Sequence, residues 1–174
     1  MIHSVPGRVG QFRRALAARR RPPDPAPAQQ ALPEPLFALF GRMPAEDRRH
    51  ALAVMALLVS RGEADAALLQ AALLHDVGKA EAGVRLHHRV SRVLLRGTAR
   101  SLWRWLAASP TGWRRPYWVM SNHPARGAVW VETQGGDADV VALIRYHESK
   151  APAAWSGTDL ARWHEALAWA DARD

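Results

Sequence analysis

The sequence predicts an all-α protein, and three observations support this fold class. Apolar residues recur at helical spacing in nearly every segment after Pro44. No run shows the sustained alternation of apolar and polar residues that is typical of a half-buried strand. Residues that start and stop helices, mainly proline, aspartate and glycine, separate these segments. We therefore expect a bundle of about six to eight helices.

The chain of 174 residues is 48% hydrophobic, which suits one globular domain with a single core. We assign residues 34–174 to this domain and residues 1–33 to a basic arm and a proline-rich connector. Within the arm, residues 8–20 predict a short basic helix. Four prolines then predict an extended connector: Pro22, Pro23, Pro25 and Pro27. An arm packed on its own domain is favoured over one that contacts a membrane or a partner.

The first helices of the domain follow from their start and stop signals. Residues 44–62 predict a helix with Pro44 at its first position and Gly62 as its stop. Residues 63–76 predict a second helix, which is almost wholly apolar and therefore central, and Gly78 ends it. Residues 86–108 predict one or two helices, with Gly97 as the candidate break.

The remaining helices are expected in the C-terminal third. Pro124 predicts a helix that begins after His123 and stops at residues 135–136. Asp137 then caps a helix ending near His147, and Thr158 caps the last one, which ends about Asp171.

Composition limits the classes of function. With no cysteine, any metal must be held by nitrogen and oxygen ligands. No apolar run is long enough to span a membrane and no secretory signal is present, so we expect a soluble cytoplasmic protein. The net charge of +8 gives only weak support to a nucleic-acid partner, since nearly all of it is arginine, which G+C-rich coding also favours. The oligomeric state is not indicated.

Polar residues on apolar helix faces carry the functional signal. His50, His75, His147 and Asp171 each lie at helical spacing from apolar residues of the same stripe, so four helices direct a potential ligand inward. Burying an unpaired carboxylate costs several kcal/mol, and a divalent cation compensates for this cost. Any one of these histidines alone is more often a hydrogen-bonded core residue, but the set predicts a metal site.

The segments around these residues resemble the HD superfamily of metal-dependent phosphohydrolases. Residues 71–79 read AALLHDVGK, like the family's HDxGK signature, with an upstream histidine in RRHALAVMALL and a distal aspartate in ALAWADARD. SNHPARGA and ALIRYHES resemble the two further histidine segments of the subset that includes the HD-GYP phosphodiesterases. The Gly-Tyr-Pro motif itself is absent, as is the Glu-Asp of the alarmone hydrolases.

The resemblance implies a set of metal ligands: His50, His75, Asp76, His123, His147 and Asp171. They would hold two transition-metal ions (Mn, Fe, Co, Ni or Zn), with Asp76 touching both, and a metal-activated hydroxide would attack phosphorus.

Catalytic and substrate-binding roles receive weaker assignments than the metal ligands. Asp76 and Lys79 are the expected catalytic residues, and Lys79 is also expected to bind substrate phosphate, although a solvated cation at a helix C-terminus explains this lysine equally well. Arg85 and Arg89 could extend the phosphate-binding rim, whereas we expect Arg92 on the solvated face of its helix. Three further histidines are expected at the surface, around the ligands or in the core: His87, His88 and His164. No role is assigned to His3.

The sequence thus predicts a phosphohydrolase, either a monoesterase or a diesterase, for a small nucleotide-like phosphoester. Two alternatives stay open. One is a di-iron oxygenase, because some HD proteins use the same six ligands to activate oxygen. The other is a metal-stabilised binding or signalling module without catalysis, whose basic surface contacts nucleic acid or an acidic partner.

Overall fold

The computed structural model of the chain describes residues 22–80, 82–84 and 86–173. Within these residues it has nine α-helices, three 3-10 helices and no strand, which confirms the all-α prediction with one helix more than expected. The predicted basic helix at residues 8–20 lies outside the described residues.

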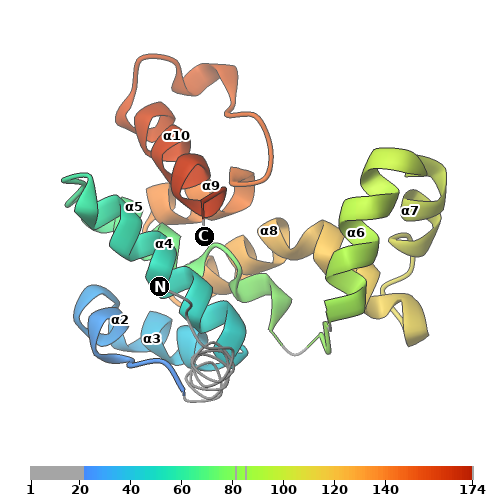
Figure 1. The fold of residues 1–174 in the computed structure, drawn as a ribbon. Helices are drawn as coiled ribbons and strands as arrows, with labels where there is room; N and C mark the ends of the chain where they lie inside the picture. The colour runs from blue at the N-terminus through green and yellow to red at the C-terminus, as the bar shows by residue number, and fades with distance from the viewer. Residues whose placement is uncertain (1–21, 81, 85, 174) are drawn as a thin grey trace, which may run out of the picture.

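Figure 1 shows the helices in chain order. The α-helices are α2 (Ala26–Ala31), α3 (Glu34–Gly41), α4 (Ala45–Ser60), α5 (Ala66–Leu74), α6 (Leu86–Thr98), α7 (Arg100–Leu106), α8 (Arg115–Thr133), α9 (Ala138–Tyr146) and α10 (Asp159–Asp171). The 3-10 helices are η1 (Val77–Lys79), η2 (Gly112–Arg114) and η3 (Ala153–Trp155).

The central helix of the bundle is α5, which packs against α2, α3, α4, α9 and α10. Its residues Leu68 and 71–74 are fully buried, as expected for a helix that is apolar all round. The side chain of Asp65 caps its first turn by accepting hydrogen bonds from the backbone N–H groups of Ala67 and Leu68. The helix ends at Leu74, so His75 and Asp76 directly follow its C-terminal end, where both side chains are buried.

The proline-rich connector is helical where we expected extended chain. Residues 26–31 form α2, because Pro27 lies in the first turn, where a helix needs no backbone N–H from it. Ala28 and Leu32 are buried in the main hydrophobic core. This segment therefore packs as part of the bundle.

The prediction that a helix begins at Pro124 was wrong. Helix α8 runs without interruption through His123 and Pro124, and its N-terminal proline is Pro116. A proline inside a helix leaves the carbonyl four residues earlier without its usual N–H partner. Here that carbonyl is Met120 O, and the His123 side chain donates to it instead, with Nδ1 and O 3.0 Å apart. The lost backbone hydrogen bond is thus replaced by one from the side chain.

Gly78 allows η1 to lie directly against α8. A Cβ at this position would be 2.1 Å from His123 O and 2.8 Å from Gly127 N, both backbone atoms. Gly127 approaches from the other side, where its own Cβ would be 3.2 Å from Gly78 N. The glycine of the HDVGK motif therefore brings the segment of Asp76 next to that of His123.

None of the described helices combines the length and the apolar character needed to cross a membrane.

We predict that Gly78→Ala destabilises the fold by about 1–3 kcal/mol, because backbone atoms would have to move to admit the methyl group. Thermal or denaturant unfolding measures this effect. Gly97→Ala is the matched control, since no atom lies within 4 Å of a Cβ there and alanine favours the helix. Equal stability of the two variants would contradict the close approach of η1 and α8.

Candidate metal centre

Six side chains converge in the structure, and they are the six that the sequence predicts as ligands. They form two groups in which the potential ligand atoms all lie within 4.8 Å of one another. One group is His50, His75 and Asp171, and the other is Asp76, His123 and His147.

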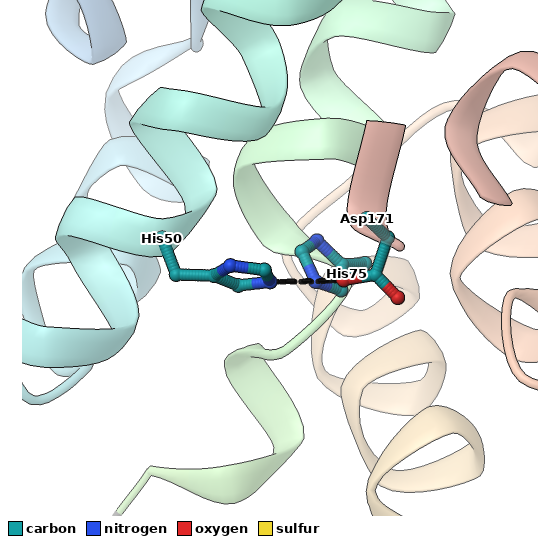
Figure 2. A group of neighbouring side chains, drawn as sticks. All are labelled: His50, His75 and Asp171. Carbon is teal, nitrogen blue, oxygen red and sulfur yellow. Dashed lines mark hydrogen bonds and ion pairs between the residues drawn. The ribbon is translucent and has the colours of Figure 1, made fainter. Parts of the chain in front are cut away.

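The first group joins three elements that are far apart in the sequence (Figure 2). His50 comes from α4, His75 follows α5, and Asp171 is the last residue of α10. His50 Nε2 lies 2.9 Å from Asp171 Oδ1 and 3.3 Å from His75 Nε2, while His75 Nε2 lies 3.5 Å from the same carboxylate oxygen. Each residue thus offers one atom to a common region.

The second group is more deeply buried. His123 comes from the middle of α8, and His147 directly follows α9. Their Nε2 atoms are 3.2 Å apart, and Asp76 Oδ1 lies 3.2 Å from His123 Nε2 and 3.9 Å from His147 Nε2. All three residues are buried.

Asp76 connects the two groups. Its Oδ1 faces His123 and His147, whereas its Oδ2 lies 3.7 Å from His75 Nε2 in the first group. Neighbouring positions in the chain, His75 and Asp76, therefore contribute to different groups. One carboxylate is placed where it could contact a cation in each.

Three of the histidines are oriented by the same hydrogen bond. His75, His123 and His147 each bond through Nδ1 to the carbonyl three residues earlier, at 2.9, 3.0 and 2.8 Å. These carbonyls are free to accept because His75 and His147 stand at helix C-termini and His123 precedes a proline. A carbonyl only accepts, so Nδ1 carries the hydrogen and a neutral imidazole keeps its lone pair on Nε2.

This arrangement fits a metal ion. In the second group, two Nε2 lone pairs and a carboxylate oxygen face one another with no donor among them, which is unfavourable unless a cation lies between them. Metal-ligating histidines in proteins usually donate their other ring N–H to a carbonyl or carboxylate, as these do. The donor set of imidazole and carboxylate is also one that transition metals accept.

The protonation states of the second group suit ligation. Burial, together with the charges of His75 and His123, lowers the pKa of His147 to about 3. Burial also lowers the pKa of His123, although Asp76 opposes the shift. Both imidazoles are therefore neutral at pH 7, the form that binds metal.

The carboxylates of the site are ionised. Burial alone would raise the pKa of Asp76, but the positive charges of Lys79 and His75 outweigh it and hold the pKa well below the usual value. Hydrogen bonds from His50 and His75 likewise outweigh burial and lower the pKa of Asp171. For His75, burial lowers the pKa but the two carboxylates outweigh it and raise it, so a proton competes with a cation for this nitrogen.

Lys79 contacts the site rather than solvent. Its Nζ lies 2.6 Å from Asp76 Oδ2, and its side chain is only 11% exposed, which excludes the solvated cation that was one interpretation of the sequence. Lys79 also lines a cavity of about 200 Å³ together with Val84, Arg92, Val93 and Met120. This cavity is therefore next to a lysine that contacts a carboxylate of the buried cluster.

Glu148 is a residue of the site that sequence reasoning missed. Its Oε1 lies 3.5 Å from His123 Nε2, and it accepts a hydrogen bond from Arg92. Arg92 was expected on the solvated face of α6, so this ion pair corrects that expectation. The only signal in the sequence was that Glu148 directly follows His147.

The other predicted residues lie elsewhere or are not described. Arg85 and the side chain of Arg89 lie outside the described part of the structure, as does His3. His87 and His88 contact each other, and His88 is buried against Tyr117. His164 Nε2 lies 3.1 Å from Tyr146 O and from Ser149 O, so it is a buried structural histidine, tying α10 to the segment after α9.

Comparison of the chain with protein-family models, with curated proteins and with solved structures finds no match. The class of protein therefore follows from the fold and the site alone. It is an all-α protein with a buried cluster of histidines and aspartates that could bind metal. This cluster is compatible with the HD-type site that the sequence resembles.

We predict that Pro124→Ala weakens metal binding by about tenfold to a hundredfold, the usual effect of losing a partner that orients a ligand. Alanine restores a backbone N–H that competes with His123 Nδ1 for Met120 O, so the imidazole loses its fixed orientation. The apoprotein should be at least as stable as the parent, since the helix regains a hydrogen bond. Isothermal titration with Mn²⁺ or Zn²⁺ and thermal melts measure the two effects.

Pro116→Ala is the control for Pro124→Ala, because Pro116 lies in the first turn of the same helix, where no backbone hydrogen bond is at stake. If both variants bind metal like the parent, the carbonyl contact does not orient His123.

Proposed function

We propose that the protein is an HD-type metal-dependent phosphohydrolase that acts on a small, nucleotide-like phosphoester. The observation that carries the proposal is the position of Asp76 between two groups of ligands, each completed by two more residues. A single open catalytic ion does not need six protein ligands, whereas two ions sharing one carboxylate do.

The chemistry of the ligands narrows the choice of metal. Four imidazoles and two carboxylates, without thiolate, suit Mn, Fe, Co, Ni or Zn better than Ca²⁺ or Mg²⁺, which prefer oxygen. Two such ions, when bound, lower the pKa of a shared water toward about 7 and polarise a phosphoryl oxygen. The residues of the chain supply the rest of the site.

The cavity beside the ligands is suited to a phosphoester. Two cationic side chains, Lys79 and Arg92, line it and would bind phosphate oxygens. Three apolar side chains form the remaining wall: Val84, Val93 and Met120. The combination favours a substrate with a compact charged end and a less polar remainder.

Glu148 would position the cationic part of this cavity. It accepts a hydrogen bond from Arg92 while lying near His123, so it fixes the guanidinium relative to the ligands. The nearby His123 and the hydrogen bond and charge of Arg92 outweigh burial and keep the pKa of Glu148 below its usual value, so Glu148 is ionised and pairs with Arg92 at pH 7.

The first test is hydrolysis of an activated phosphoester, such as nitrophenyl phosphate or its diester, by protein loaded with Mn²⁺, Co²⁺ or Ni²⁺. We expect metal-dependent release of nitrophenol, and Asp76→Asn should lower it by about a hundredfold or more because a carboxylate shared by both ions is lost. Asp159→Asn is the control, since this aspartate is 70% exposed at the start of α10. Hydrolysis that Asp76→Asn leaves unchanged would remove Asp76 from the catalytic site.

Absence of hydrolysis across the panel, with metal present at two equivalents, would contradict the hydrolase proposal. Oxygen consumption by the iron-loaded protein would then favour the oxygenase.

The second test addresses substrate binding by Arg92. Arg92→Ala should raise KM for the phosphoester by about tenfold to a hundredfold, the loss expected for a hydrogen bond between charged groups, and should leave two metal equivalents in place. Steady-state kinetics and metal analysis measure these quantities. Arg145→Ala, which removes an exposed arginine that pairs with Glu132, should change neither. A KM unaffected by Arg92→Ala would exclude this arginine from phosphate binding.

A further inference from the structure

The positive charge of the protein is concentrated in two stretches of the chain, residues 1–23 and residues 82–131. Residues 82–131 contain nine arginines and no aspartate or glutamate, while the whole chain has a net charge of +8. Residues 1–23 likewise contain six arginines and no acidic residue, so residues 24–81 and 132–174 together carry a net charge of −7. A uniform compositional bias toward arginine does not explain such a separation, because acidic residues are also excluded from both stretches.

Much of the second stretch forms a separate lobe, made of α6, α7 and η2, which we call the arginine lobe. Figure 1 shows α6 and α7 at one end of the molecule, apart from α4, α5 and α10. Helix α6 packs against α7 and α8. The lobe thus extends from the bundle with much of its surface uncovered.

The arginine lobe also carries most of the exposed apolar side chains. Among the described residues, the exposed large hydrophobic residues outside it are Val59 and Val129. Those within it are Val90, Val93, Leu94, Leu102, Trp105 and Trp113. Val90, Val93 and Leu94 are three and four residues apart on α6, so they form one stripe of that helix.

Two tryptophans of the lobe lie together under an arginine. The rings of Trp105 and Trp113 have centroids 6.0 Å apart, and the Arg114 guanidinium lies 4.7 Å from the Trp105 ring while it donates to Trp105 O. Trp113 is 67% exposed and Trp105 is 54% exposed. Indole rings beside cationic side chains are typical of the interface between lipid headgroups and acyl chains.

Cationic side chains of the lobe also surround a cavity of about 570 Å³. It is lined by Arg96, Arg100, Trp103 and Arg104. Three guanidinium groups around one space would bind anionic phosphate oxygens. This cavity is distinct from the one beside the metal ligands, whose cations are Lys79 and Arg92.

We propose that the arginine lobe docks the protein on an anionic lipid bilayer. The arginines match negatively charged headgroups, and the exposed aliphatic and indole side chains would enter the region below them. A second copy of the chain is disfavoured as the occupant because two lobes of like charge would repel each other. A nucleic acid would satisfy the arginines but would leave the exposed valines and leucines without an apolar partner.

Co-sedimentation of the full chain with vesicles tests the proposal. Vesicles of phosphatidylcholine with about 30% phosphatidylglycerol should bind at least about tenfold more protein than vesicles of phosphatidylcholine alone, and salt should weaken the binding. Leu94→Gln with Leu102→Gln keeps the charge constant and should lower binding by about tenfold or more, since it removes apolar contacts with the bilayer.

Val59→Gln with Val129→Gln is the matched control, because these valines are 52% and 46% exposed against 59% and 45% for the two leucines. It should bind vesicles like the parent. Circular dichroism verifies that each variant is folded.

A second measurement does not depend on the leucine variants. Lipids brominated on their acyl chains should quench the tryptophan fluorescence of the bound protein, and Trp105→Phe with Trp113→Phe should remove most of the quenching. Absence of binding to anionic vesicles, equal binding to neutral ones, or binding unchanged by the leucine pair would overturn the proposal. Binding to duplex DNA but not to vesicles would also overturn it, in favour of a nucleic-acid surface.

Discussion

Three histidines donate their Nδ1–H to a backbone carbonyl three residues earlier, and the candidate metal centre depends on this contact. Each bond fixes the ring, so that Nε2 is directed at other ligand atoms and carries a lone pair when the imidazole is neutral. Helix C-termini supply two of the free carbonyls, and Pro124 supplies the third. Gly78 then permits the backbone contact that brings Asp76 next to His123. The arrangement of the candidate ligands therefore depends on the local backbone structure at the helix ends, at Pro124 and at Gly78.

The bundle serves this arrangement by bringing distant segments together. The C-terminal half of α5 is fully buried, and it places His75 and Asp76 where α4, α8, α9 and α10 meet. Two carboxylates at this position would be costly without positive charge nearby. In the apoprotein Lys79 and His75 provide that charge, and bound cations would provide it more completely. Asp76 lies close to His75 in one group and to His123 in the other, so its carboxylate interacts electrostatically with both groups.

The sequence predicted the helical fold from periodic patterns, and the same patterns drew attention to His50, His75, His147 and Asp171. Asp76 and His123 entered the ligand set only through the resemblance to the HD superfamily. The sequence did not predict the course of α8, since Pro124 after His123 resembles a helix start, and only the three-dimensional contact with Met120 O explains the proline. It also missed Glu148, whose importance comes from Arg92 on a helix 56 residues away. The helix at residues 26–31 was missed because proline is compatible with both a first turn and an extended connector. In each case tertiary context decided between two local possibilities.

The central claim is that six ligands hold two ions with Asp76 between them. Anomalous X-ray scattering from crystals grown with Mn²⁺ or Zn²⁺, recorded at the absorption edge of the metal, tests it most directly. The account predicts two peaks per chain about 3.5–4 Å apart, one beside His50 and one beside His147, with Asp76 between them. A single peak within either group, or metal bound only at the surface, would contradict it.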